Sequence, residues 1–222
     1  MIIYHGSKQV IEKPSAKGSN PLNDYGPSFY LTADLLSAKM WACKRDELGL
    51  VNKYEVRNET YAGFKILDLT DKKKYSILNW VAILAHFRKL DHRFIVQNQE
   101  ALDWLSRYYI DVNQYDVVIG FRADDSYFRF PKEFINGSLA YEDLENVYLL
   151  GDLGIQYAFM SEKATASLKF VSSIECEPSF LGKYYETVKK ATEALDELLA
   201  QPKLSSKTYI MDLVRKSNAK RR

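Results

Sequence analysis

Two stretches near the amino terminus decide the fold: Tyr4-His5-Gly6-Ser7 and Asp24-Tyr25-Gly26-Pro27-Ser28-Phe29-Tyr30-Leu31-Thr32. The first ends a short apolar strand with a histidine and a glycine, and the second opens an aromatic strand after a glycine turn. An imidazole beside an unhindered backbone, facing an aromatic ring on another strand, can form the two walls of a narrow cleft for a dinucleotide. The two stretches therefore predict a β-rich start with a ligand cleft.

Composition sets the limits around these stretches. The chain has 222 residues, a formal net charge of +2 and 46% hydrophobic residues, which is enough for a substantial core in one domain, with or without an appendage. No window approaches the roughly 18 apolar residues that span a bilayer, and the first residues lack the features of a signal peptide. We therefore expect a cytoplasmic protein with no membrane partner. Cys43 and Cys176 form no CxxC pair and are expected to be small buried residues.

Periodicity along the chain alternates between strand and helix. Strand patterns occur at 1–5, 29–32, 51–57, 64–69, 115–121, 155–161 and 169–174. Helical patterns occur at 33–46 (capped by Thr32 and ended by Gly49), within 72–109, and at 180–201 and 209–214. The sequence thus predicts an α+β protein: a domain over residues 1–176 with a helical insertion at about 72–109, and a C-terminal helical appendage with a basic tail over 177–222.

The order of His5-Gly6 and Tyr30 resembles the diphtheria-toxin and poly-ADP-ribose-polymerase branch of the NAD-dependent ADP-ribosyltransferases. More closely, the strings YHGS, DYGPSFYLTADLLSAKMWA, YDVVIG and IQYAFMSEKA look like an uncharacterised bacterial family, commonly catalogued as a domain of unknown function and grouped with these transferases. These strings occur in the same order and span most of residues 1–175. The resemblance implies an ADP-ribosyltransferase-like split β-core that binds NAD as co-substrate.

The resemblance also implies roles for the residues of the cleft. His5 would contact the adenosine-side ribose, Gly6 the nicotinamide amide and Tyr30 the nicotinamide face, where stacking adds about 1 kcal/mol. Ser7 belongs to the same cofactor-binding motif, and Trp41 either supplies the opposite aromatic wall or packs in the core of its helix. Taken alone, the residues also fit a core histidine, a turn glycine and a core aromatic strand. At Pro27-Ser28 related sequences more often carry a second glycine.

A third position decides whether the cleft does chemistry. Breaking the nicotinamide-ribose bond develops positive charge on the sugar, which a carboxylate could stabilise. Polymerase-like relatives use glutamate, whereas the matching segment here offers Gln156. An amide orients a hydroxyl without a full charge, so the expected activity is mono-ADP-ribosyl transfer or slow transfer. Glu162 would share a face with Gln156 on a regular strand, yet a separation of roughly 20 Å argues against it.

The loop after the 115–121 strand carries three further candidates. Arg122 could meet the NAD pyrophosphate as a charge-assisted fork. Asp124 or Asp125 could bind an acceptor or polarise its nucleophile. The same residues fit an Asx turn with a solvated salt pair equally well.

Other chemistries find no support. His86 and His92 lack ligand spacing, and no HExxH, CxxC or EF-hand string occurs, so no metal is expected. No Rossmann or P-loop glycine motif and no serine-nucleophile motif is present. The lysine runs predict a solvated face, and the near-zero net charge argues against extended duplex binding.

The resemblance therefore implies an NAD-dependent mono-ADP-ribosyltransferase, a glycosyltransferase acting on a protein or nucleic-acid acceptor. From the resemblance, a bacterial toxin or conflict effector with a neutralising antitoxin partner is expected. The competing reading is a non-catalytic module that binds NAD, ADP-ribose or a nucleic-acid end. A weaker third reading is RNA 2′-phosphotransfer, whose arginine-rich site is not evident. The 180–201 helix could pack on its own domain, dock a partner or form a dimer.

Overall fold

The structure, a computed structural model, describes all residues except 46, 124–127, 148–153 and 220–222. One sheet has the strand order β1-β3-β7 and is antiparallel. The other has the order β2-β6-β5-β4, in which only the β4–β5 pair is parallel. The strands are β1 (Ile2–Ser7), β2 (Phe29–Leu31), β3 (Leu50–Glu55), β4 (Ile66–Asp68), β5 (Val117–Phe121), β6 (Ile155–Phe159) and β7 (Lys169–Glu175). Together with the helices described below, they confirm the α+β class.

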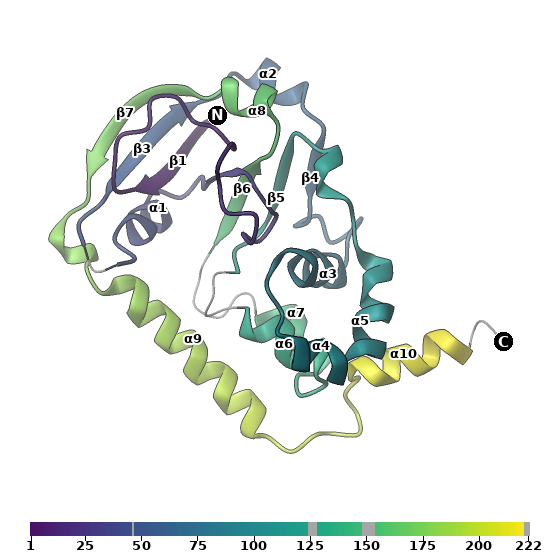
Figure 1. The fold of residues 1–222 in the computed structure, drawn as a ribbon. Coiled ribbons are helices and arrows are strands. Elements are labelled where there is room, and N and C mark those ends of the chain that lie inside the picture. The colour runs from purple at the N-terminus through teal and green to yellow at the C-terminus, as the bar shows by residue number, and fades with distance from the viewer. Residues whose placement is uncertain (46, 124–127, 148–153, 220–222) are drawn as a thin grey trace.

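The two sheets meet where the two amino-terminal motifs meet. The amide of Tyr4 donates to the carbonyl of Thr32 at 2.8 Å, and the amide of Thr32 donates back at 2.9 Å. Side chains of Ile3, Phe29 and Phe159 are buried in a shared apolar cluster beneath this bridge. The bridge therefore brings the middle of β1 against the residue that follows β2, and Figure 1 shows the sheets side by side.

Helix α1 (Leu35–Ala42) covers the β1-β3-β7 sheet (Figure 1). Its N-cap is Asp34, whose carboxylate accepts from the amides of Leu36 and Ser37. The prediction that Thr32 caps this helix is wrong, because Thr32 is held in the bridge and its Oγ1 donates to the carbonyl of Ile155 at 3.1 Å. The helix also ends earlier than predicted, with Cys43 as its C-cap.

Helices fill most of residues 72–109. They are α3 (Ile77–Phe87), α4 (His92–Gln97) and α5 (Gln99–Leu105), followed by the 3₁₀ turns η1 (Ser106–Tyr108) and η2 (Val112–Gln114). Ser76 and Asn79 form a capping box at the start of α3. The helices bury Trp80 and Trp104 in the largest apolar cluster, which also receives Val118 of β5. This helical part therefore shares a core with the β2-β6-β5-β4 sheet.

Two helices follow β7 and the 3₁₀ turn η3 (Pro178–Phe180): α9 (Lys183–Ala200) and α10 (Ile210–Ala219). Ala191, Leu195, Ile210 and Val214 are buried in the same large cluster. The apolar stripe of α9 thus packs on its own domain, and α9 extends along one side of the molecule in Figure 1. The remaining helices are α2 (Asn58–Ala62), α6 (Arg129–Ile135), α7 (Tyr141–Val147) and α8 (Glu162–Ala166). Within the described residues, no helix is both long enough and apolar enough to span a bilayer.

Candidate functional site

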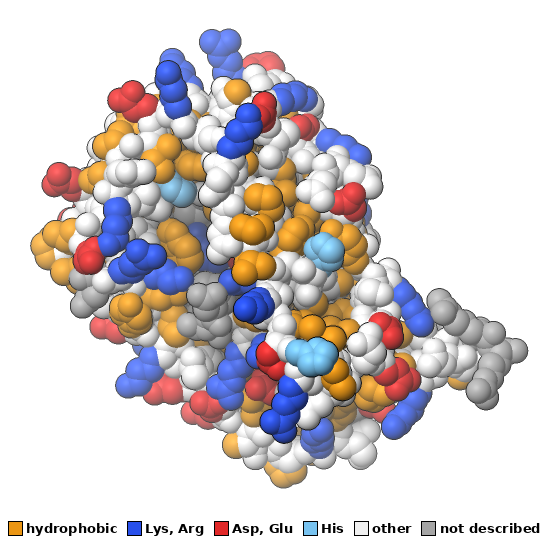
Figure 2. Space-filling view, in the orientation of Figure 1, with side chains coloured by type: hydrophobic (Ala, Val, Ile, Leu, Met, Phe, Trp, Pro, Cys, Tyr) orange, Lys and Arg blue, Asp and Glu red, His pale blue; other side chains and the backbone are white. Residues whose placement is uncertain are grey.

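A cavity of about 710 Å³ opens between β1, the connection from β1 to β2, and α1. It is large enough for a cofactor-sized ligand. Its lining contains six of the residues that the sequence singles out: His5, Gly6, Tyr30, Trp41, Arg122 and Gln156. We refer to it as the cleft. Figure 2 shows a hollow on this face, with lysine and arginine side chains along its lower edge.

His5 is held in one orientation. Its Nδ1 lies 2.7 Å from the backbone carbonyl oxygen of Tyr30, and its ring stacks on Phe29 with the centroids 4.4 Å apart. A carbonyl only accepts, so Nδ1 carries the proton and the neutral ring keeps Nε2 as an acceptor. Burial lowers the pKa of His5, against the raising effect of the Tyr30 carbonyl, and the nearby charge of Arg122 lowers it further. A neutral imidazole that can accept from a ligand hydroxyl therefore lies at the cleft.

Tyr30 uses its hydroxyl inside the protein. The hydroxyl donates to the carbonyl of Gly26 at 2.8 Å and accepts from the amide of Tyr25 at 3.0 Å. Burial raises the pKa of Tyr30, so the phenol stays neutral. These bonds fasten the turn before β2, and the half-buried ring is the part of Tyr30 that a ligand can contact.

Trp41 forms the wall of the cleft on α1, and two cationic side chains lie over its ring. The guanidinium of Arg122 lies 4.7 Å from its ring centroid and the ammonium of Lys44 lies 4.4 Å from it. The edge of Tyr184 also meets the ring. Both roles expected for Trp41 are compatible with this position, because it lines the cleft and packs against α9.

Basic groups dominate the charged side chains of the cleft. The described lining contains Lys17, Lys44, Arg45, Arg88 and Arg122, with Asp24 as its carboxylate. Clefts lined mainly by one sign of charge concentrate ligands of the opposite sign. The lining therefore suits an anionic ligand such as a nucleotide phosphate.

Gly6 has a packing reason for being glycine. A Cβ at this position would lie 2.3 Å from the carbonyl oxygen of Ala38 and 2.7 Å from the amide nitrogen of Ala42. The residue therefore lets α1 approach β1 closely. Ser7 is absent from the cleft lining: its Oγ accepts from Nδ2 of Asn52 at 3.0 Å and donates to the carbonyl of Gln9. The prediction of Ser7 as a cofactor-binding residue finds no support in this geometry.

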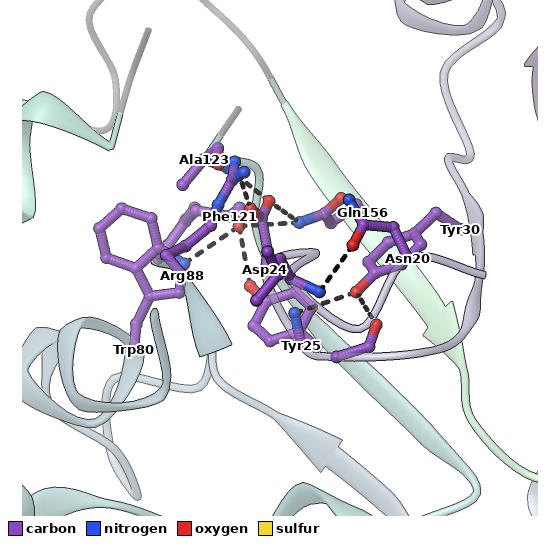
Figure 3. A network of polar contacts seen from close by, with 11 residues as sticks. Asn20, Asp24, Tyr25, Tyr30, Trp80, Arg88, Phe121, Ala123 and Gln156 are labelled. Atoms are coloured by element: carbon purple, nitrogen blue, oxygen red, sulfur yellow. Dashed lines mark hydrogen bonds and ion pairs between the residues drawn. The ribbon is translucent and has the colours of Figure 1, made fainter. Parts of the chain in front are cut away.

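Gln156 lies in a buried polar network at the floor of the cleft (Figure 3). Its Nε2 donates to Oδ2 of Asp24 at 2.7 Å and to the carbonyl of Phe121 at 3.3 Å. The same Asp24 oxygen accepts from the amide of Ala123 at 2.8 Å. Nη2 of Arg88 lies 2.8 Å from the other carboxylate oxygen and donates to the carbonyl of Ala123. The network joins the β1–β2 connection to the ends of α3, β5 and β6.

The carbonyl of Phe121 is the second centre of this network. Besides Gln156, it accepts from the hydroxyl of Tyr25 at 2.8 Å and from Nε1 of Trp80 at 3.1 Å (Figure 3). Tyr25 is completely buried, and burial raises its pKa. Gly120 makes room for it, because a Cβ there would lie 2.1 Å from the Tyr25 hydroxyl oxygen.

Sequence reasoning missed Asp24 and Arg88. Asp24 opens the second motif, and Arg88 immediately follows the apolar period of α3. The signal for Asp24 was its place beside the aromatic strand, but an exposed turn aspartate looks the same in sequence. The signal for Arg88 was weaker still, because a basic residue commonly ends a helix.

Of the remaining candidates, Glu162 is not among the described residues that line the cleft. Strand β6 ends at Phe159, and Ser161 caps α8, where Glu162 is the first residue. The condition that would put Glu162 on the same face as Gln156 therefore fails, and Glu162 instead forms an exposed ion pair with Lys17. Asp124 and Asp125 lie outside the described residues. Among the described residues no group of three or more His, Cys, Asp or Glu side chains could hold a metal ion.

Comparisons with known proteins give a family without an assigned activity. No curated protein and no solved structure matches the chain. A family model with the description "Protein of unknown function (DUF3990)" matches residues 1–170. This range contains every described residue that lines the cleft. The chain therefore belongs to the DUF3990 family of proteins of unknown function.

Proposed function

We propose that this protein is an NAD-dependent mono-ADP-ribosyltransferase with an ADP-ribosyltransferase-like split β-core. The observation that carries the proposal is the meeting of His5, Tyr30 and Gln156, from three different strands, at one cleft with a basic lining. Their order along the chain is the order in the transferases that the sequence resembles. On the same resemblance, we extend the proposal to a bacterial toxin or conflict effector with a neutralising partner.

The cleft offers a group for each part of the dinucleotide. The neutral His5 ring supplies an acceptor for a ribose hydroxyl, and the Tyr30 ring supplies a stacking surface for nicotinamide. Arg122 and Lys44, both over Trp41, supply positive charge for the pyrophosphate. In the proposed reaction the bond between the ribose carbon and the nicotinamide nitrogen breaks. Nicotinamide leaves with the electron pair, and an acceptor nucleophile bonds to the same carbon and loses its proton.

One observation favours the second candidate, a module that binds NAD or ADP-ribose without turnover. The carboxylate of the described cleft lining, Asp24, is engaged by Arg88, Ala123 and Gln156. The Gln156 amide contributes a dipole but no full negative charge to an oxocarbenium-like transition state. Transfer is therefore expected to be slow even where binding is saturable.

The test is incubation with NAD labelled in the ADP-ribose part, together with cell extract, followed by separation into protein, RNA and DNA fractions. Label in one fraction, abolished in Tyr30→Ala and His5→Ala, supports transfer to that class of acceptor. Tyr185→Ala and His86→Ala serve as controls, because both side chains lie outside the cleft lining. Saturable NAD binding with neither label nor nicotinamide release selects the binding module. Absence of NAD binding at millimolar levels refutes the transferase, and absence of both NAD and ADP-ribose binding refutes both candidates.

A further inference from the structure

We propose that Asp24 is a positioning residue that fixes the orientation of the Gln156 amide, with the nitrogen in the buried network and the oxygen presented to the cleft as an acceptor for a ligand hydroxyl. The orientation follows from this chain's own contacts. Only the identification of the ligand as NAD rests on the proposed function.

The chemistry of the neighbours sets the orientation of the amide. The Gln156 nitrogen donates to the Asp24 carboxylate and the Phe121 carbonyl, which are acceptors without a proton to donate. The Tyr25 hydroxyl also lies beside the Gln156 amide, but it donates its proton to the Phe121 carbonyl. A reversed amide would place its oxygen 2.7 Å from a carboxylate oxygen, which is repulsive. Within the described part of the chain the amide oxygen makes no hydrogen bond, so its acceptor capacity is left for a ligand.

Asp24 is itself held from several directions. Arg88 neutralises it, with exposed side-chain fractions of 13% for Arg88 and 7% for Asp24. The amide of Ala123 donates to the oxygen that Gln156 also uses. The carboxylate therefore cannot turn away without breaking a buried ion pair, and Gln156 faces a rigid partner (Figure 3).

This arrangement explains why glutamine suits position 156. A glutamate there would bring a second carboxylate against Asp24 and the Phe121 carbonyl, and two adjacent carboxylates cannot both ionise without a large cost. With glutamine, the cleft instead presents two neutral acceptors, Nε2 of His5 and Oε1 of Gln156. Two acceptors select a ligand with hydroxyl donors, and the ribose of a nucleotide belongs to this class.

The test compares the binding of NAD with that of an analogue that lacks the 2′-hydroxyl of the nicotinamide ribose, by calorimetry. The wild-type protein is expected to prefer NAD by about tenfold, as for one hydrogen bond to a positioned acceptor. In Asp24→Asn the preference is expected to fall below about threefold, because the amide can then reverse. A folded Asp24→Asn protein that keeps the tenfold preference overturns the proposal.

The matched control is Asp116→Asn. Asp116 precedes β5, at the opposite end from Phe121, and accepts from Oγ of Ser161 at 2.6 Å and from the amide of Lys65 at 3.0 Å. The Asp116→Asn variant therefore perturbs a similar set of hydrogen bonds at a site outside the cleft lining. The control should keep the wild-type preference for NAD, whereas equal loss in both variants would mean a structural effect and overturn the positioning role.

A second readout does not depend on NAD. In a nitrogen-15 NMR spectrum the side-chain amide of Gln156, assigned through Gln156→Ala, should exchange with solvent far more slowly than that of the exposed Gln201. Asp24→Asn should remove this protection. If NAD fails to bind but the protection is present and depends on Asp24, the proposed function fails and the orientation stands. Unprotected wild-type Gln156 overturns the orientation itself.

Discussion

Oδ2 of Asp24 lies 2.7 Å from Nε2 of Gln156, although 132 positions separate the two residues in the chain. The contact joins the connection that leads into β2 to the strand next to it in the sheet. Both residues line the cleft. The hydrogen bond that joins these two segments of the fold therefore also determines which polar groups lie at the cleft floor. Stability and ligand recognition are therefore expected to change together when this network is altered.

Removing the cation from the network should be costly. Arg88→Met leaves the buried carboxylate of Asp24 without its ion-pair partner, and we expect the free energy of unfolding to fall by about 3–5 kcal/mol in urea denaturation. Asp24→Asn/Arg88→Met should recover part of this loss, because the uncompensated charge is gone. Arg129→Met breaks the exposed pair with Asp196 and should cost at most about 1 kcal/mol. Equal costs for the two single variants would contradict the prediction.

Gly6→Ala should destabilise the packing of α1. The added Cβ would lie 2.3 Å from the carbonyl oxygen of Ala38, so helix and strand must separate, at a cost of about 1–3 kcal/mol. Gly63→Ala is the control, because the nearest atom to its Cβ would be the carbonyl oxygen of Thr60 at 3.5 Å. The midpoints of chemical denaturation should separate the two variants, and a Gly6→Ala protein as stable as the control would show that α1 shifts freely.

His5 should make stability depend on pH below neutrality. Its folded pKa is lower than the ordinary 6.5, so the unfolded chain binds a proton that the folded protein resists. The stabilising contribution is present above about pH 6.5 and is lost as the pH falls from there towards the folded pKa. The loss of unfolding free energy between pH 7.5 and pH 5 should be smaller in His5→Gln than in the wild type. Equal losses of unfolding free energy in the two proteins would refute the attribution of this pH dependence to His5.

The two thiols should be unreactive in the folded protein. Cys43 and Cys176 are 1% and 5% exposed, as expected from their lack of any pairing motif. Burial, together with the neighbouring Cys43, raises the pKa of Cys176 to about 12. Because the thiolate is the reactive form, a colorimetric disulfide reagent should modify neither residue without denaturant and both in urea. Rapid modification of the native protein would contradict this prediction.

The sequence predicts the elements whose pattern is local. Every strand of both sheets coincides with an apolar or alternating run, and the long α3 and α9 coincide with apolar periods, because a buried face must repeat with the geometry of its own element. The short helices α2, α6 and α7 were not predicted. Each is shorter than the window of residues that periodicity needs.

The cleft was only partly predictable, for a different reason. His5, Tyr30 and Gln156 follow from motif order, whereas the Asp24–Arg88 pair depends on contacts between distant segments that no local pattern encodes. The misplacement of Glu162 had a readable cause: Ser161 is a good N-cap residue, and its Oγ accepts from the amide of Ala164, which ends the strand and starts α8. A helix-capping residue within an apolar segment therefore ends the strand, even where the apolar pattern continues beyond it.

The close approach at Gly6 has a counterpart at Gly49, where a Cβ would lie 2.3 Å from the carbonyl oxygen of Ala42. The final turn of α1 thus packs directly against the backbone of Gly6 and of Gly49, with no side chain of either residue in between. Trp41 lies in this turn. Its position therefore does not depend on the size of neighbouring side chains, which changes among homologues in an ordinary core. Homologues that retain both glycines should superimpose closely at this wall, even where the surrounding apolar residues have been exchanged.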